Sequence, residues 1–368
     1  MRRPLTDLEL PERRYAPRNR RSYTITPDGR IEVDSAKRLC YPFWLTTEPE
    51  SVFVPAATSM GVDGNGIPIL AGGITNLPAI MPIDEKGPFE AMFSSFTAIR
   101  ALDGLQTDQF TIVVFDPEFR PLLMNREIHA RTMAGGFGSA PIAGSVLPPA
   151  ATAGGRPLVW PETFFMDPDD AGKAVFVGFR NLATDSAINV RFVLHGVRYY
   201  AMKPYEDAVR EKERMFGMGR TSYPYFYTTD SDIGLAPTGT PGDNAEFHMR
   251  ITDDADVEIF KMTHFADQGP NSFLWRIQEK AGKRFLDSAG PVTAAGGPNG
   301  LPGGFGFGDA EFPFIPFETL YWEQNFKAIL SVANVAGPSL SNRVWLTFVS
   351  RKIVPVQSYR RKVVHVED

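Results

Sequence analysis

The chain has a single cysteine, Cys40, among its 368 residues, which excludes an internal disulfide and a multi-cysteine metal site. Long apolar runs are also missing. Nowhere do about 18 uncharged apolar residues follow one another, so we expect no membrane-spanning helix. Residues 1–11 lack the apolar core of a signal peptide, so we expect no secretory signal. The stability of the fold must therefore come from packing. We expect a soluble globular protein.

Catalytic motifs are missing as well. None of the five histidines has the spacing of a zinc-binding pair, and there is neither a nucleophile elbow nor a phosphate-binding loop. The glycines of residues 303–308 lack dinucleotide-binding order and indicate a flexible connection. We expect no catalytic residue, no cofactor and no metal, and predict that the protein is not an enzyme. The histidines are His129, His195, His248, His264 and His365.

Carboxylates cluster at residues 167–170, 230–232 and 253–256, but none of these runs has the spacing of an EF-hand loop. Acidic side chains at turns between strands usually cap those turns. A sandwich-fold hydrolase whose carboxylates are far apart in the sequence remains an alternative.

Glycine and proline are abundant, at 33 and 31 residues, and they punctuate short apolar runs. This pattern is typical of β-sandwiches and barrels. Hydrophobic residues make up 43% of the chain, which suffices for packed cores, and the net charge of −5 is dispersed. The composition favours an all-β protein, and the length favours two domains at ~150 residues each.

The chain repeats one β-rich unit. Residues 41–50 (YPFWLTTEPE) match residues 223–232 (YPYFYTTDSD), and residues 110–115 match 272–277. We expect residues 89–100 to match 246–251. In the closing strand-loop-strand of each unit, Asn181 matches Asn334 and Arg198 matches Arg351 at an offset of 153 residues. The same offset makes Phe348 the counterpart of His195. The Tyr-Pro motifs differ by 182 residues, so the first unit carries extra chain, predicted near residues 60–88.

One helix, residues 202–216, separates the units. Pro204 suits its first turn, early acidic residues and late basic residues suit the helix dipole, and we interpret these charges as helix stabilisation. We predict an all-β fold of two tandem antiparallel, jelly-roll-like sandwiches with extended arms. The predicted domains are an N-terminal arm (1–38), sandwich 1 (39–201), a linker helix (202–219), sandwich 2 (220–354) and a C-terminal tail (355–368).

Basic residues gather in both arms, where apolar side chains are too few to offset the entropy of ordering. Such arms are solvated tails or wrap around a partner. Direct nucleic-acid binding is not expected except by the N-terminal arm. The candidate interaction residues are Arg13, Arg14, Arg18, Arg20, Arg21, Arg360 and Arg361.

Tyr223, Tyr225 and Tyr227 alternate along one predicted strand. An aromatic row on a sandwich can bind sugars, whereas an alternating row normally faces the core, which is the interpretation we favour.

The chain resembles structural proteins of tailed-bacteriophage virions. The resemblance lies in residues 125–129 (NREIH), in the Phe164-Phe165 pair leading into 175–182 (VFVGFRNL), and in 191–200 (RFVLHGVRYY). It implies a non-enzymatic protein of the head, neck or tail, assembled in the host cytoplasm with copies of itself and other virion proteins. A carbohydrate-binding attachment module is the alternative function.

Overall fold

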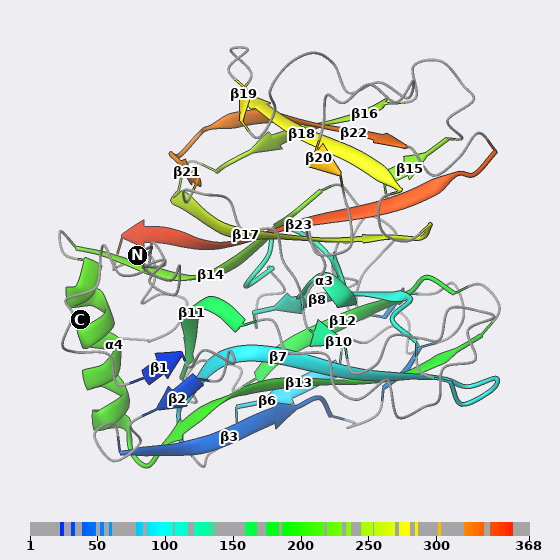
Figure 1. The fold of residues 1–368 in the computed structure, drawn as a ribbon. Coiled ribbons are helices and arrows are strands. Elements are labelled where there is room, and N and C mark those ends of the chain that lie inside the picture. Colours follow the sequence, from blue (N-terminus) through cyan, green and yellow to red (C-terminus); the bar gives the residue numbers. More distant parts are fainter. Residues whose placement is uncertain are drawn as a thin grey trace, which may run out of the picture.

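Antiparallel sheets in a sandwich-like arrangement, and one long helix between two sets of strands, make up the computed structural model (Figure 1). This confirms the predicted all-β fold with one joining helix. None of the helices that the structure describes has the length and apolar composition needed to span a membrane. The described residues are 23–25, 31–33, 39–48, 52–54, 59–60, 79–83, 87–105, 107–116, 121–133, 135–136, 159–167, 174–183, 186–216, 219–229, 233–236, 244–252, 254–268, 272–279, 284–285, 301–302, 320–334 and 339–355.

The first unit contains two sheets. In sheet 1A the order is β10, β7, β13 and β3, with β11 also beside β7 and β4 beside β13. In sheet 1B the order is β5, β12, β8 and β9, with β6 also beside β12. The strands are β3 (Cys40–Thr46), β4 (Val52–Val54), β5 (Ser59–Met60), β6 (Ala79–Pro82), β7 (Phe89–Arg100), β8 (Phe110–Phe115), β9 (Ile128–His129), β10 (Gly135–Gly136), β11 (Val159–Met166), β12 (Ala174–Asn181) and β13 (Ile188–Tyr199). A short helix, α3 (Ala130–Met133), follows β9, and a separate hairpin pairs β1 (Tyr23–Ile25) with β2 (Ile31–Val33).

The second unit follows α4 (Met202–Phe216) and has the same plan. Sheet 2A has the order β14, β23, β17 and β21, with β15 also beside β23. Sheet 2B has the order β16, β22, β18 and β19, with β20 also beside β18. The strands are β14 (Arg220–Thr228), β15 (Ile233–Leu235), β16 (Asn244–Arg250), β17 (Asp256–Ala266), β18 (Phe273–Glu279), β19 (Arg284–Phe285), β20 (Leu301–Pro302), β21 (Leu320–Trp322), β22 (Lys327–Asn334) and β23 (Asn342–Pro355).

A β-bulge recurs at the same place in both units. Where β7 pairs with β13, the register skips Met92, and where β17 pairs with β23 it skips Phe260. The strand equivalent to β7 is therefore β17, and our expected match of residues 89–100 with 246–251 is wrong. Residues 246–251 instead begin within β16, which pairs with β22. The equivalent partners of β12 in the first unit are the shorter strands β5 and β6.

A buried asparagine closes the last hairpin of each unit. The Asn181 amide donates to the carbonyl of Ser186, five residues on, and the Asn334 amide donates to the carbonyl of Leu340, six residues on. Each amide also donates to a carbonyl at the short strand beside β13 or β23. The predicted equivalence of these two asparagines is consistent with their matching hydrogen bonds.

The second hairpin loop is one residue longer, so the offset becomes 154 in the last strand. The bulge and the strand register then make Arg351 the equivalent of Val197 in the first unit, and Val349 the equivalent of His195. Our matches of Arg198 with Arg351 and of His195 with Phe348 are wrong by one residue. A shift of one residue along a strand moves each side chain to the other face of the sheet. The corrected offset therefore decides which side chains of the two units are equivalent.

Sheet 2A is buried on both faces, because it lies between sheet 2B and the first unit (Figure 1). On the inner face, Val344, Leu346 and Phe348 pack in the core of the second unit. On the outer face, Phe226 and Val349 belong to the core of the first unit. The two units thus share packed surface, although the exact residue limits of the predicted domains stay a prediction.

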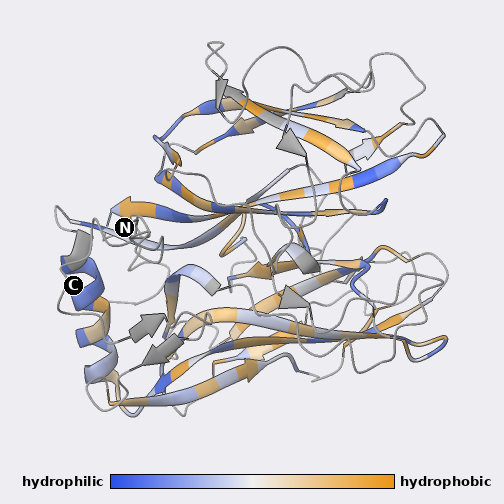
Figure 2. Cartoon of the chain, in the orientation of Figure 1, coloured by the Kyte–Doolittle hydropathy of each residue, from blue (hydrophilic) through white to orange (hydrophobic). Residues whose placement is uncertain are grey.

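Direct contacts cross this interface. The Thr132 hydroxyl of α3 lies 2.8 Å from the Thr347 hydroxyl, and the ring of His129 stacks on that of Phe265 with centroids 4.0 Å apart. The backbone N–H of Phe226 donates to the carbonyl of Leu123. Figure 2 shows hydrophobic segments along the strands of both units.

Candidate binding pocket and the interface between the units

The helix α4 carries a buried cation into the interface. Lys212 is only 3% exposed, and its Nζ donates to the carbonyl of Thr163 at 2.5 Å and lies 3.6 Å from the carboxylate of Glu162. On the same helix, Tyr205 packs edge-on against the rings of Phe165 and Tyr199. The helix is therefore fixed to the strands by an ion pair as well as by apolar contact.

Glu162 is the centre of a buried network of charged and polar side chains. Its carboxylate accepts a hydrogen bond from the Ser222 hydroxyl and lies 3.6 Å from Arg351, which also binds Glu258 at 2.6 Å. Burial by itself would raise the pKa of Glu162, but the charges of Lys212 and Arg351, with hydrogen bonds, outweigh it and hold that pKa below its ordinary value.

Our interpretation that helix stability explains the charges of α4 fails at Lys212. Glu206 and Arg210 fit it, as an exposed i,i+4 pair with a separation of 3.5 Å. Burial lowers the pKa of Lys212, and Glu162 and Glu90 oppose that change only in part. The sequence pattern cannot reveal this role, because Lys212 looks like any basic residue late in a helix.

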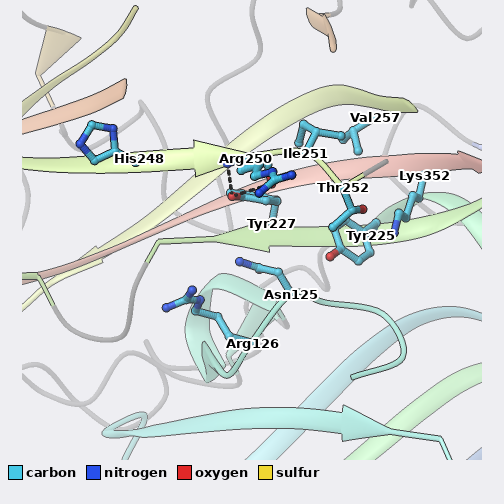
Figure 3. A pocket seen from close by; sticks show the side chains of 10 residues that line it. All are labelled: Asn125, Arg126, Tyr225, Tyr227, His248, Arg250, Ile251, Thr252, Val257 and Lys352. Atoms are coloured by element: carbon cyan, nitrogen blue, oxygen red, sulfur yellow. Dashed lines mark hydrogen bonds between the residues drawn. The ribbon is translucent and has the colours of Figure 1, made fainter. Parts of the chain in front are cut away.

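A pocket of about 240 Å³ opens at one end of the second sandwich (Figure 3). Its wall consists of β14, β17 and β23 with the end of β16, and residues 125 and 126 of the first unit close one side. The lining residues are Asn125, Arg126, Tyr225, Tyr227, His248, Arg250, Ile251, Thr252, Val257 and Lys352.

Two half-buried tyrosines form the aromatic part of the wall. The Tyr227 hydroxyl accepts a hydrogen bond from the Arg250 backbone N–H at 2.9 Å and donates to the carbonyl of the same residue. The Lys352 ammonium lies over the Tyr225 ring, 5.2 Å from its centroid. The ordinary tyrosine pKa of about 10 already keeps both hydroxyls protonated at neutral pH, and burial raises the pKa of both further.

The polar part of the wall is cationic. Arg126, Arg250 and Lys352 line the pocket, and no acidic residue does so among the residues that the structure describes. Lys352 pairs at 2.8 Å with Asp254, a half-exposed residue beside the pocket.

The first unit has larger, packed side chains at the equivalent positions among the described residues. The register makes Phe89 the equivalent of Val257 and Phe43 the equivalent of Tyr225. Phe89 is fully buried and packs edge-on against Phe43, and the Arg198 guanidinium covers Phe43 at 3.8 Å. The small Val257 side chain therefore leaves room in the second unit that a phenylalanine ring fills in the first.

The three tyrosines of β14 differ in their surroundings, and we compare them with the two interpretations of this row, as core residues or as a sugar-binding surface. Tyr223 is 1% exposed and belongs to the core, as we favoured. Tyr225 and Tyr227 are half-buried, pack against the cores of the first and the second unit, and also line the pocket, so sugar binding by this row stays a prediction. The sequence missed Val257, since only the corrected register shows that it replaces Phe89.

The other candidate residues are engaged in packing or lie outside the described residues. The His195 Nε2 lies 2.7 Å from the Ser95 hydroxyl, the ring stacks on Phe93, and burial lowers the pKa of this histidine. Asp256, from one acidic cluster, binds Arg220. Within the described ranges no group of three or more histidine, cysteine or acidic residues could hold a metal. The arginines of both arms are not among the described residues and stay a prediction.

No family model and no curated protein matches the chain. Among solved structures, it is similar to PNGF-II (TM-score 0.27, 11% identity), with 83% of this chain and 66% of the other covered. It is also similar to the triple-jelly-roll turret protein of an archaeal virus (0.18, 10%), with 83% and 60% covered. A third similar structure is the infectious bursal disease virus VP2 subviral particle (0.19, 11%), with 88% and 74% covered. The chain spans less than two thirds of the first two, and scores this low assign no function.

Proposed function

We propose that the chain is a non-enzymatic structural protein of a tailed-bacteriophage virion, assembled in multiple copies in its head, neck or tail. The proposal follows the sequence resemblance to such proteins. One structural observation supports it: within the described ranges several side chains on the outer face of sheet 1A are exposed, whereas the equivalent face of sheet 2A is buried against the other unit.

The equivalent residues of the two faces differ in exposure. Trp44 of β3 is 63% exposed, while its equivalent, Phe226 of β14, is fully buried. Arg191 of β13 is exposed, while its equivalent, Trp345, is buried in the interface. Of the ten exposed large hydrophobic side chains among the described residues, eight belong to the first unit. Three of these eight, Trp44, Phe53 and Ile99, share the outer face of sheet 1A, and apolar surface gathered on one face is typical of an interaction site.

The contacts of the buried face of sheet 2A support a proposal for the partner of the exposed face of sheet 1A. The outer face of sheet 2A packs against α3, β9 and β11 of the first unit. We therefore propose that sheet 1A of one copy binds the second unit of another copy head to tail. Such heterologous contacts form rings or open filaments.

The replacement Trp44→Ser is expected to weaken self-association by at least tenfold, because it removes the most exposed large side chain of the outer face of sheet 1A. Light scattering and sedimentation over a range of concentrations would measure this. Tyr321→Ser is the control, since Tyr321 is a half-exposed aromatic residue on the second unit. A wild-type chain that stays monomeric and binds no other virion protein would contradict the proposal.

A carbohydrate-binding attachment module is the second candidate function, and the pocket beside Tyr225 and Tyr227 favours it. Aromatic side chains with nearby polar groups are suited to sugar recognition. In a glycan array, Tyr225→Ala is expected to abolish any signal of the wild-type chain, with a thermal melt to show that the variant is folded. The absence of signal from the wild-type chain would remove this candidate.

A further inference from the structure

We propose that the edge of β3 that faces away from β13 pairs with the same edge of a second copy of the chain. The two strands run antiparallel about a two-fold axis at Trp44, so that sheet 1A continues from one copy into the other. This contact goes beyond the proposed function, in which the outer face of sheet 1A, and not its edge, binds another copy. Three observations carry it: the pairing of the equivalent edge of β14, the direction of the backbone groups of β3, and the lack of charge on β3.

The edge of β14 that faces away from β23 is paired with a segment of the first unit. The Phe226 N–H donates to the carbonyl of Leu123 at 2.8 Å, and the Asn125 N–H donates to the carbonyl of Phe226 at 3.4 Å. Met124 lies opposite Phe226 in a parallel bridge. The side-chain amide of Asn125 donates to the Thr228 carbonyl at 2.9 Å and accepts from the Thr228 N–H at 2.8 Å. This sheet edge therefore binds an added segment of chain through its backbone groups.

Strand β3 directs the same backbone groups away from its sheet. The register makes Trp44 the equivalent of Phe226, and Thr46 takes the place of Thr228 in the same way. The next N–H, of Thr47, donates inward to a carbonyl of β13 at 3.3 Å. Because successive residues of a strand direct their backbone groups to opposite sides, those of Trp44 and Thr46 point away from β13. Among the residues that the structure describes, β13 is the only strand that pairs with β3, which lies at the lower border of the first unit in Figure 1.

The composition of β3 suits pairing with a second copy of itself. Residues 40–46 (CYPFWLT) carry no charge, so two such edges meet without the charge repulsion that commonly protects edge strands. Pro42 removes one N–H from the edge, but Pro224 stands at the equivalent position of β14, whose edge is paired all the same. Residues 123–125, which pair with β14, are engaged within their own chain. The partner that we infer for the β3 edge is therefore the β3 edge of another copy.

An axis at Trp44 gives this pairing a definite register. The two Trp44 residues exchange N–H and carbonyl groups, and the Thr46 N–H of each copy donates to the carbonyl of Pro42 in the other. Residues paired in this way have Cα atoms about 5.5 Å apart. The Trp44 side chain is 63% exposed in the single chain, and the pairing brings the two rings side by side on one face of the joined sheet. Aromatic pairs across strands stabilise a sheet, and closed two-fold contacts are the commonest in symmetric assemblies.

The variant Trp44→Cys tests the register, because a disulfide requires Cα atoms about 4.4–6.8 Å apart. Under mild oxidation of the full chain, it is expected to form covalent dimers in at least tenfold higher yield than Ile99→Cys. Ile99 is also an exposed residue of the outer face, but it lies on β7, beyond β13 from the edge. Cys40 is buried, so the wild-type chain gives the background. Equal yields from the two variants would overturn the pairing and leave the proposed function intact, because a head-to-tail contact does not bring two copies of residue 44 together.

The variant Thr46→Pro tests the backbone contact. It removes an N–H that faces away from β13, whereas Thr46→Val keeps that N–H and is the matched control. Sedimentation equilibrium is expected to give a dimer dissociation constant at least tenfold higher for Thr46→Pro than for the wild-type chain, and an unchanged one for Thr46→Val. Thermal melts show whether both variants are folded, and the disulfide yield of Trp44→Cys decides the question if Thr46→Pro is not. A wild-type chain that forms no dimer, or a folded Thr46→Pro that dimerises as the wild type does, would overturn the proposal.

Discussion

Replacing Glu162 by glutamine is expected to lower the free energy of unfolding by about 3–5 kcal/mol, the cost of breaking a buried ion pair from one side. The substitution keeps the shape of the side chain but removes the negative charge between Lys212 and Arg351. Arg351 keeps Glu258 as a partner at 2.6 Å. Lys212 is left more than nine-tenths buried with its nearest carboxylate gone, so α4 should lose much of its attachment.

Chemical denaturation monitored by tryptophan fluorescence would measure this loss. The control is Glu206→Gln on the same helix, which removes an exposed pair and should cost ~0.5 kcal/mol or less. The double variant Glu162→Gln/Lys212→Met should recover part of the loss, because it removes both charges. Equal stability of Glu162→Gln and Glu206→Gln would show that the network does not hold the units together.

The same carboxylate predicts a dependence of stability on pH. Because its pKa is lowered in the folded protein, its contribution is fully present above about pH 4.3, the ordinary glutamate value, and is lost as the pH falls through the folded-state pKa. The wild-type protein should therefore lose more stability on acidification than Glu162→Gln does. Parallel acid titrations of the two proteins that show identical losses would contradict this assignment.

Gly196→Ala is expected to cost about 3 kcal/mol or more, above the usual range for overpacking. Gly196 lies beside the bulge of β7, and a Cβ there would clash with the carbonyl oxygen of Glu90 and lie 2.8 Å from its carbonyl carbon. These are backbone atoms in the centre of sheet 1A, so relief requires the two long strands to separate.

The second unit provides the control for this prediction. The equivalent residue is Ser350, whose hydroxyl donates to the carbonyl of Tyr225. Ser350→Ala should cost only ~1 kcal/mol, the value of one hydrogen bond. Thermal melts of the two variants would compare them directly, and a loss in Gly196→Ala no larger than that in Ser350→Ala would refute the close approach.

Local patterns in the sequence were enough to predict the class of the fold, the tandem repeat and the joining helix. Alternating apolar residues and Gly/Pro punctuation report on single strands and turns, and neither needs a distant partner to be read. The matching of Asn181 with Asn334 also followed from the sequence, because both asparagines stand at the same turn of the same hairpin.

Register, burial and the pocket were decided by tertiary structure alone. One extra residue after Asn334 reverses the face of every side chain in β23 relative to the sequence match, and only the hydrogen-bonded ladder reveals it. The burial of Lys212 depends on Glu162, 50 positions away in the sequence. Val257 lines the pocket at the position where the first unit has Phe89, an equivalence set by strand pairing between distant segments.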